Sequence, residues 1–140
     1  MITEYTKDEE ILELVRSFEN ATIARDDWRH TEHLVVALYY TTEYELQTAT
    51  DKMRAGIFNL LSAFMVDLTK EMPYHETLTV FWMRTVDEFR KANAELSMFE
   101  TANALVRSFD KEHPLKFYSR GRLFSDEARS NYIEPELRPS

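Results

Sequence analysis

Apolar residues recur at the spacing of an α-helix along most of the chain. The first series consists of Ile11, Leu14, Val15 and Phe18. It follows Thr6 and Glu9, which have the spacing of a capping box, so we expect a helix to begin there.

Four more amphipathic series predict four further helices. Their apolar stripes fall within residues 34–38, 46–68, 78–89 and 99–109. The predicted helix starts are Asp26 or Asp27, a capping box of Thr42 and Glu45, Pro73, and a capping box of Ser97 and Glu100. The third helix is apolar over so wide an arc that we expect it to lie at the centre of the bundle.

Beyond Pro114 the helical pattern loosens, and aromatic residues are scattered among basic and polar ones. Ser125, followed by acidic residues, predicts the start of a short terminal helix. One interpretation of this segment is a strap that packs over the bundle. The other is a lid that brings Arg120, Arg122 or Arg129 toward a bound anion.

The pattern therefore predicts an all-α fold, a compact bundle of about five helices with a C-terminal aromatic strap and a short terminal helix. A chain of 140 residues, 44% of them hydrophobic, is expected to form one core. Residues 1–140 are thus predicted to be a single domain, with the main bundle in 1–113 and the strap in 114–140. Only 2 glycines and 4 prolines leave little material for hairpins.

Charge and cysteine content exclude several classes of partner and chemistry. A formal net charge of −8 repels phosphate backbones and anionic lipid, so we expect no nucleic-acid partner. The chain has no cysteine, which excludes disulfides and thiolate chemistry. Residues 1–5 show no secretory signal, and the longest apolar stretch, residues 55–68, is interrupted by polar side chains. We therefore expect a cytoplasmic protein with no membrane partner.

The residues best suited to chemistry are three histidines and one glutamate. His30 and His33 are three positions apart, so on a helix their Cβ atoms lie about 5–6 Å apart and both rings can face one metal ion. His75, three positions before Leu78, is directed inward at the start of the fourth helix. Glu19 lies at the border of the first apolar stripe, where a buried carboxylate needs a cation or hydrogen-bond donors.

Helical bundles build metal sites by projecting Glu and His side chains from facing helices. The candidate metal ligands, for Zn, Fe, Mn or Ni, are Glu19, His30, His33 and His75. Glu76 is a candidate ligand or catalytic base, and Tyr74 is a candidate for orienting a substrate. Glu32 is expected to be solvated.

Two other interpretations use the same residues without a metal. In one, each histidine is a core residue whose ring donates to a carbonyl or carboxylate. In the other, a histidine and a glutamate act as general acid and base in a polar pocket walled by Tyr40, Tyr74 and Trp82. Arg54 would either bind a substrate carboxylate or form a structural ion pair, for instance with Glu19.

Two motifs stand out, W-x-H-x-x-H-L over residues 28–34 and Y-H-E-T over residues 74–77. On these motifs, on Phe18-Glu19 and on C-terminal pairs such as Tyr118-Ser119, the chain resembles a family of small helical bacterial proteins of uncharacterised function. The resemblance spans most of the chain. It implies a bacterial source and a shared pattern of candidate residues, but it names no reaction.

Two functional hypotheses follow. The leading one is a protein that binds a divalent metal or a small polar ligand at the His and Glu site, with a small metal-dependent enzyme as its more specific form. The alternative is a non-catalytic interaction or scaffold protein whose histidines are structural. Self-association into a homo-oligomer is compatible with both hypotheses.

Overall fold

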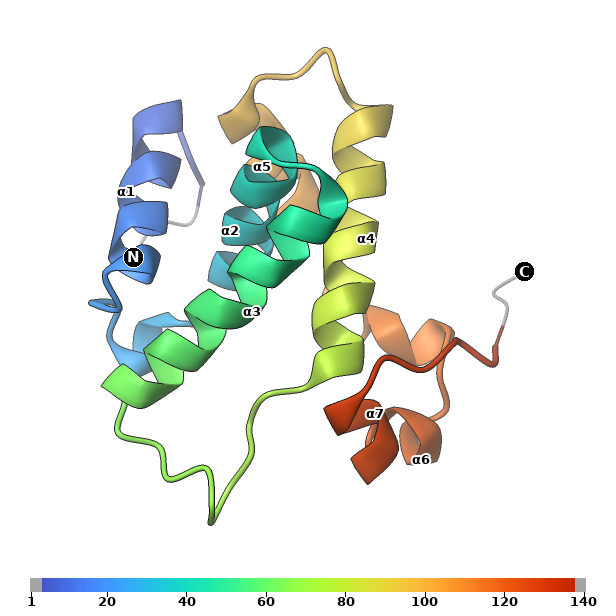
Figure 1. Cartoon of the computed structure of the whole chain (residues 1–140). Coiled ribbons are helices and arrows are strands. Elements are labelled where there is room, and N and C mark those ends of the chain that lie inside the picture. Colours follow the sequence, from blue (N-terminus) through green and yellow to red (C-terminus); the bar gives the residue numbers. More distant parts are fainter. Residues whose placement is uncertain (1–3, 138–140) are drawn as a thin grey trace.

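The computed structural model describes residues 4–137 and is built from helices. In chain order these are α1 (Asp8–Glu19), 3₁₀ turn η1 (Arg25–Asp27), α2 (His30–Glu43), α3 (Leu46–Ala63), α4 (Glu76–Ala92), α5 (Met98–Ser108), 3₁₀ turn η2 (His113–Lys116), α6 (Arg120–Leu123) and α7 (Asp126–Ser130). The described part contains no strand, so the predicted all-α class is confirmed (Figure 1). Residues 1–3, at the predicted signal-free N-terminus, and residues 138–140, at the end of the predicted strap, lie outside the described residues.

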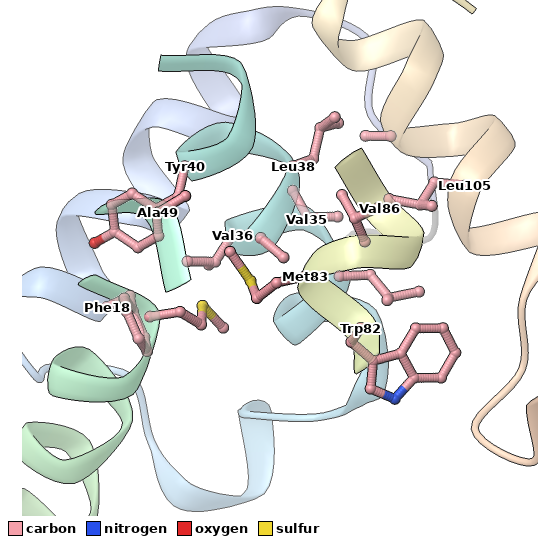
Figure 2. Close-up of a cluster of buried hydrophobic side chains, with 14 of the residues drawn as sticks. Phe18, Val35, Val36, Leu38, Tyr40, Ala49, Trp82, Met83, Val86 and Leu105 are labelled. Atoms are coloured by element: carbon pink, nitrogen blue, oxygen red, sulfur yellow. The ribbon is translucent and has the colours of Figure 1, made fainter. Parts of the chain in front are cut away.

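Helix α2 is the centre of the bundle and contacts α1, α3, α4 and α5 (Figure 1). Its run from Leu34 to Leu38 is at most 1% exposed, because a helix surrounded by neighbours must be apolar on every side. Figure 2 shows Val35, Val36 and Leu38 packed with Met83, Val86 and Leu105.

The prediction that the third helix would be central is wrong. Helix α3 contacts α1, α2 and α4, but its buried residues are only Ala49, Thr50, Met53 and Leu60. The wide apolar arc of α3 is half-buried, whereas the short apolar run of α2 is enclosed.

Two predicted helix starts are confirmed. The Ser97 hydroxyl accepts from the backbone N–H of Glu100 at 3.3 Å, and the Glu100 carboxylate accepts from the backbone N–H of Ser97 at 3.0 Å, which completes the capping box of α5. The Ser125 hydroxyl accepts from the N–H of Ala128 at 3.2 Å and caps α7.

The other predicted starts are displaced. At α1 the carboxylate that accepts from the backbone N–H of Thr6, at 2.8 Å, belongs to Glu10 rather than Glu9. Asp26 and Asp27, predicted to start the second helix, lie in η1. Thr42, predicted to start the third helix, lies near the end of α2, and Pro73, predicted to start the fourth, lies ahead of α4. At Thr42 the hydroxyl donates to the carbonyl of Leu38 at 2.7 Å, so the side chain bonds within α2 instead of capping α3.

The C-terminal segment is tied to the start of α4. The hydroxyl of Thr77 donates to the carbonyl of Asn131 at 2.8 Å and accepts from the N–H of Ile133 at 3.2 Å. The buried Tyr118 donates its hydroxyl proton to the carbonyl of Ile133 at 2.7 Å, and Leu123 is 1% exposed. These contacts fix the segment against α4 (Figure 1).

Two arginines of the lid hypothesis, Arg120 and Arg122, have internal contacts. Arg120 reaches Glu112 at 3.5 Å, and Arg122 donates to the carbonyl of Glu134 at 2.9 Å. Arg129 lines a second pocket, which also contains Arg54 and shares Tyr74 with the histidine pocket described below. None of the described helices combines the length and apolar character needed to span a membrane.

Candidate functional site: a histidine-lined pocket

A pocket of about 330 Å³ lies between the N-terminal parts of α2 and α4. His30 and His33 reach it from the first turn of α2, and His75, the residue that caps α4, reaches it from the other side. Its aromatic walls are Trp28, Tyr74 and Trp82. Three of the four predicted ligands thus line one pocket.

His33 has the least satisfied polar atom of the pocket. Its Nε2 is buried and has no hydrogen-bond partner, although the side chain as a whole is partly exposed. Burial is the main cause that lowers the pKa of His33 to about 4, and the nearby His30 contributes to the same lowering. The imidazole is therefore neutral at physiological pH.

His30 is anchored by a long-range hydrogen bond. Its Nε2 lies 3.1 Å from the carbonyl oxygen of Phe109, so this nitrogen carries the proton and donates it. The ring also contacts Trp82 edge-on, at 4.9 Å between centroids. In the neutral ring Nδ1 then keeps a lone pair that can accept a hydrogen bond.

His75 has both ring nitrogens engaged. Its Nδ1 accepts from the backbone N–H of Leu78 at 3.2 Å, which caps α4, and its Nε2 donates to the carbonyl of Leu123 at 2.6 Å. Burial is the main cause that lowers the pKa of His75, with a further contribution from the charge of Arg129. Because neither nitrogen has a free lone pair, this ring cannot ligate a metal without losing its structural bonds.

Glu19 does not join the histidines. It is exposed at the last position of α1 and accepts a hydrogen bond from the hydroxyl of Tyr40 at 2.9 Å. The spacing argument placed it at the border of an apolar stripe, but at the end of α1 that border faces solvent.

The predicted four-residue metal site is therefore not supported. Glu19 lies outside the pocket, and both ring nitrogens of His75 are hydrogen-bonded to backbone groups. Among residues 4–137, no group of three or more His, Asp or Glu side chains is arranged to hold a metal ion.

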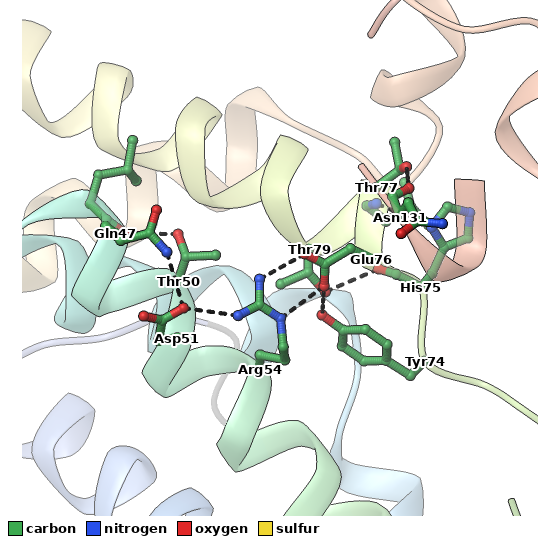
Figure 3. A network of polar contacts seen from close by, with 12 residues as sticks. Gln47, Thr50, Asp51, Arg54, Tyr74, His75, Glu76, Thr77, Thr79 and Asn131 are labelled. Carbon is green, nitrogen blue, oxygen red and sulfur yellow. Dashed lines mark hydrogen bonds and ion pairs between the residues drawn. The ribbon is translucent and has the colours of Figure 1, made fainter. Parts of the chain in front are cut away.

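Tyr74, a wall of the histidine pocket, also belongs to a polar network with Glu76 and Arg54 (Figure 3). The guanidinium of Arg54 donates to the two carboxylate oxygens of Glu76 at 2.9 and 2.7 Å, and the hydroxyl of Tyr74 donates to Glu76 at 2.5 Å. Burial alone would raise the pKa of Glu76, but the bonds from Arg54 and Tyr74 outweigh it and leave the pKa below its usual value. Glu76 is thus an ionised structural partner and a weak base, and Arg54 pairs with it rather than with Glu19.

The charge of the histidine pocket is one-sided. Among the described residues that line it, none carries a carboxylate, whereas two, Arg29 and Lys111, are basic. Glu32, predicted to be solvated, is only 8% exposed and accepts from the Arg29 guanidinium at 3.1 and 2.9 Å. Lys111 is exposed and has no ion-pair partner within residues 4–137.

Lys111 is a lining residue that the sequence did not indicate. It lies between α5 and η2, outside any helical repeat, and the fold alone brings it to helices α2 and α4. Its position two residues after Phe109, the partner of His30, is a local signal that is visible only once the structure is known.

Comparison with known proteins gave no match to a family model, to a curated protein or to a solved structure. The resemblance to a bacterial family stays a prediction.

Proposed function

We propose that the protein binds a small polar molecule in the pocket between α2 and α4. The proposal rests on one observation above all: of the 4 histidines in the chain, His30, His33 and His75 line this single pocket. Its volume of about 330 Å³ lies at the lower end of the range found for ligand pockets, which corresponds to a small ligand. Apolar walls with a few polar groups are the usual composition of such sites.

The state of His33 supports a binding role. A buried polar atom without a partner costs about 1–3 kcal/mol of stability, so such atoms are rare unless function retains them. His33 has this defect at Nε2 and lines the pocket. Residues that violate the rules of stable packing tend to mark functional sites.

The lowered pKa values of His33 and Glu76 do not suit these two residues to act as general bases. A general base works best with a pKa near the working pH, whereas that of His33 is about 4 and that of Glu76 is lowered by its partners. A metal would need free ligands, and His75 has none to offer. A ligand held by hydrogen bonds and ring contacts suits the pocket better.

The alternative, an interaction protein, also has a supporting observation. The connection between α3 and α4 exposes Met65, Leu68 and Met72, with exposed fractions of 89%, 39% and 46%. Exposed apolar side chains on one segment are a common feature of protein contact surfaces. Under this alternative the histidine pocket would have no ligand.

A fragment screen tests the proposal directly. Trp28 and Trp82 are the only tryptophans of the chain, and both line the pocket, so their indole N–H signals in a proton–nitrogen NMR spectrum report on it. We expect small polar fragments to shift both indole signals, with the Trp28→Phe and Trp82→Phe variants used to assign them.

The control lies in the same spectra. Fragments that bind elsewhere shift backbone amides but leave both indole signals in place. A library in which no fragment moves either indole would contradict the proposal and favour the interaction protein.

A further inference from the structure

The charge around the histidine pocket selects the sign of its ligand. Arg29 is held by Glu32, and the imidazole of His33 is neutral because its pKa is about 4. Lys111 is then the lining cation with no ion-pair partner in residues 4–137, and none of the described lining residues is acidic. A bound cation would meet repulsion here, whereas one negative charge would find a partner at the rim.

The helix ends add to the same preference. The N-terminal ends of α2 and α4 both border the pocket, and each carries a partial positive charge from the helix dipole, with the first-turn acid of α2, Glu32, paired to Arg29. Glu76, the acidic residue in the first turn of α4, lines the neighbouring pocket and is neutralised by Arg54. Its charge therefore does not cancel the effect of Lys111.

The walls of the pocket select the shape of the ligand. Trp28, Tyr74 and Trp82 line the pocket with aromatic atoms, although Tyr74 and Trp82 are only 7% and 4% exposed, and Leu78 and Ile57 complete an apolar lining. The indole of Trp28 is already stacked on Phe18 at 4.9 Å between centroids, and that of Trp82 meets His30 edge-on. The parts of these rings that line the pocket can accept a further flat ring by edge contact.

We propose that the ligand of this pocket is a small planar aromatic carboxylate, with its ring between Trp28, Tyr74 and Trp82 and its carboxylate directed to Lys111. This inference rests on the proposed function, since it names the class of ligand for the same site. The neutral imidazole of His33 then adds no charge to the site.

Calorimetry of the full chain with four probes tests the class at neutral pH. Benzoate, benzamide and benzamidinium share ring and shape but differ in charge, and cyclohexanecarboxylate has the charge without the flat ring. We expect benzoate to bind most tightly, benzamidinium to show no binding, and cyclohexanecarboxylate to bind about fivefold more weakly than benzoate.

A pair of lysine variants provides the matched control. Lys111→Ala should weaken benzoate binding about fivefold, the effect of losing one exposed ion pair, and should leave benzamide binding unchanged. Lys116→Ala removes the same charge from the exposed Lys116, which is not a lining residue, and should change neither.

The results separate this inference from the proposed function. If benzamide or benzamidinium binds as tightly as benzoate, or if Lys111→Ala has no effect, the ligand class is wrong while the pocket remains a binding site. If fragments shift the two indoles but no aromatic carboxylate binds, the class is again overturned. If neither the fragments nor the four probes bind, both proposals fail.

Discussion

A His33→Leu variant is expected to retain, under mildly acidic conditions, stability that the wild-type protein loses. Burial lowers the pKa of His33 from 6.5 to about 4 in the folded chain. When the pH falls below 6.5, the pKa of this histidine in the unfolded state, the unfolded chain binds a proton that the folded chain does not bind. The free energy of unfolding therefore decreases until the pH reaches the pKa of the folded state. The loss is about 3 kcal/mol over this interval, and leucine removes it.

Urea unfolding of both proteins at a series of pH values measures this difference. At neutral pH the variant should be no less stable than the wild type, since it no longer buries an unpartnered nitrogen. The control is His113→Leu, which removes a partly buried imidazole outside the pocket lining and should leave most of the acid-induced loss in place. Equal pH dependence for His33→Leu and the wild type would show that His33 is not the buried neutral imidazole described above.

Gly56→Ala is expected to destabilise the fold by about 2–3 kcal/mol, the effect of overpacking a core. In an exposed helix the same change would stabilise by about 0.5–1 kcal/mol. At Gly56, however, an added Cβ would overlap the ring atoms Cε2 and Cζ of Phe18. Phe18 is 0% exposed and stacked on Trp28, so its ring has no room to move away.

The other glycine of the chain is the matched control. Gly121 lies in α6 with no positive φ, and a Cβ added there meets no atom within 4 Å. Gly121→Ala should therefore be neutral or stabilising by about 0.5 kcal/mol. Unfolding curves that place Gly56→Ala at or above the wild type would mean that Phe18 does not pack against α3 as described.

The helical class followed from the sequence because apolar spacing is a local property. The choice of the central helix did not, because spacing measures how wide an apolar face is and not how many neighbours cover it. Residues 46–68 have the wider face, but the run from Leu34 to Leu38 is the one enclosed on all sides.

The sequence predicted the position of a site residue correctly where the direction of its side chain depends on the helix alone. The inward directions of His30 and His33 follow from their spacing to apolar residues on α2, whereas His75 has extended backbone ahead of α4 and reaches the same pocket as its cap. The role of each ring depends on distant partners, such as the carbonyls of Phe109 and Leu123, which no local pattern reveals. The same holds for Lys111, which the fold brings in from the segment after α5.

The central claim is that the pocket lined by His30, His33 and His75 is a binding site. The most direct measurement is a proton–nitrogen NMR spectrum of the imidazole rings, recorded with and without saturating benzoate. We expect the ring nitrogens of His30 and His33 to shift, with a smaller change at His75, whose nitrogens stay bonded to the backbone, and with His113 unaffected because it is not a lining residue. Benzoate binding that moves His113 alone, or none of the four rings, would contradict the claim.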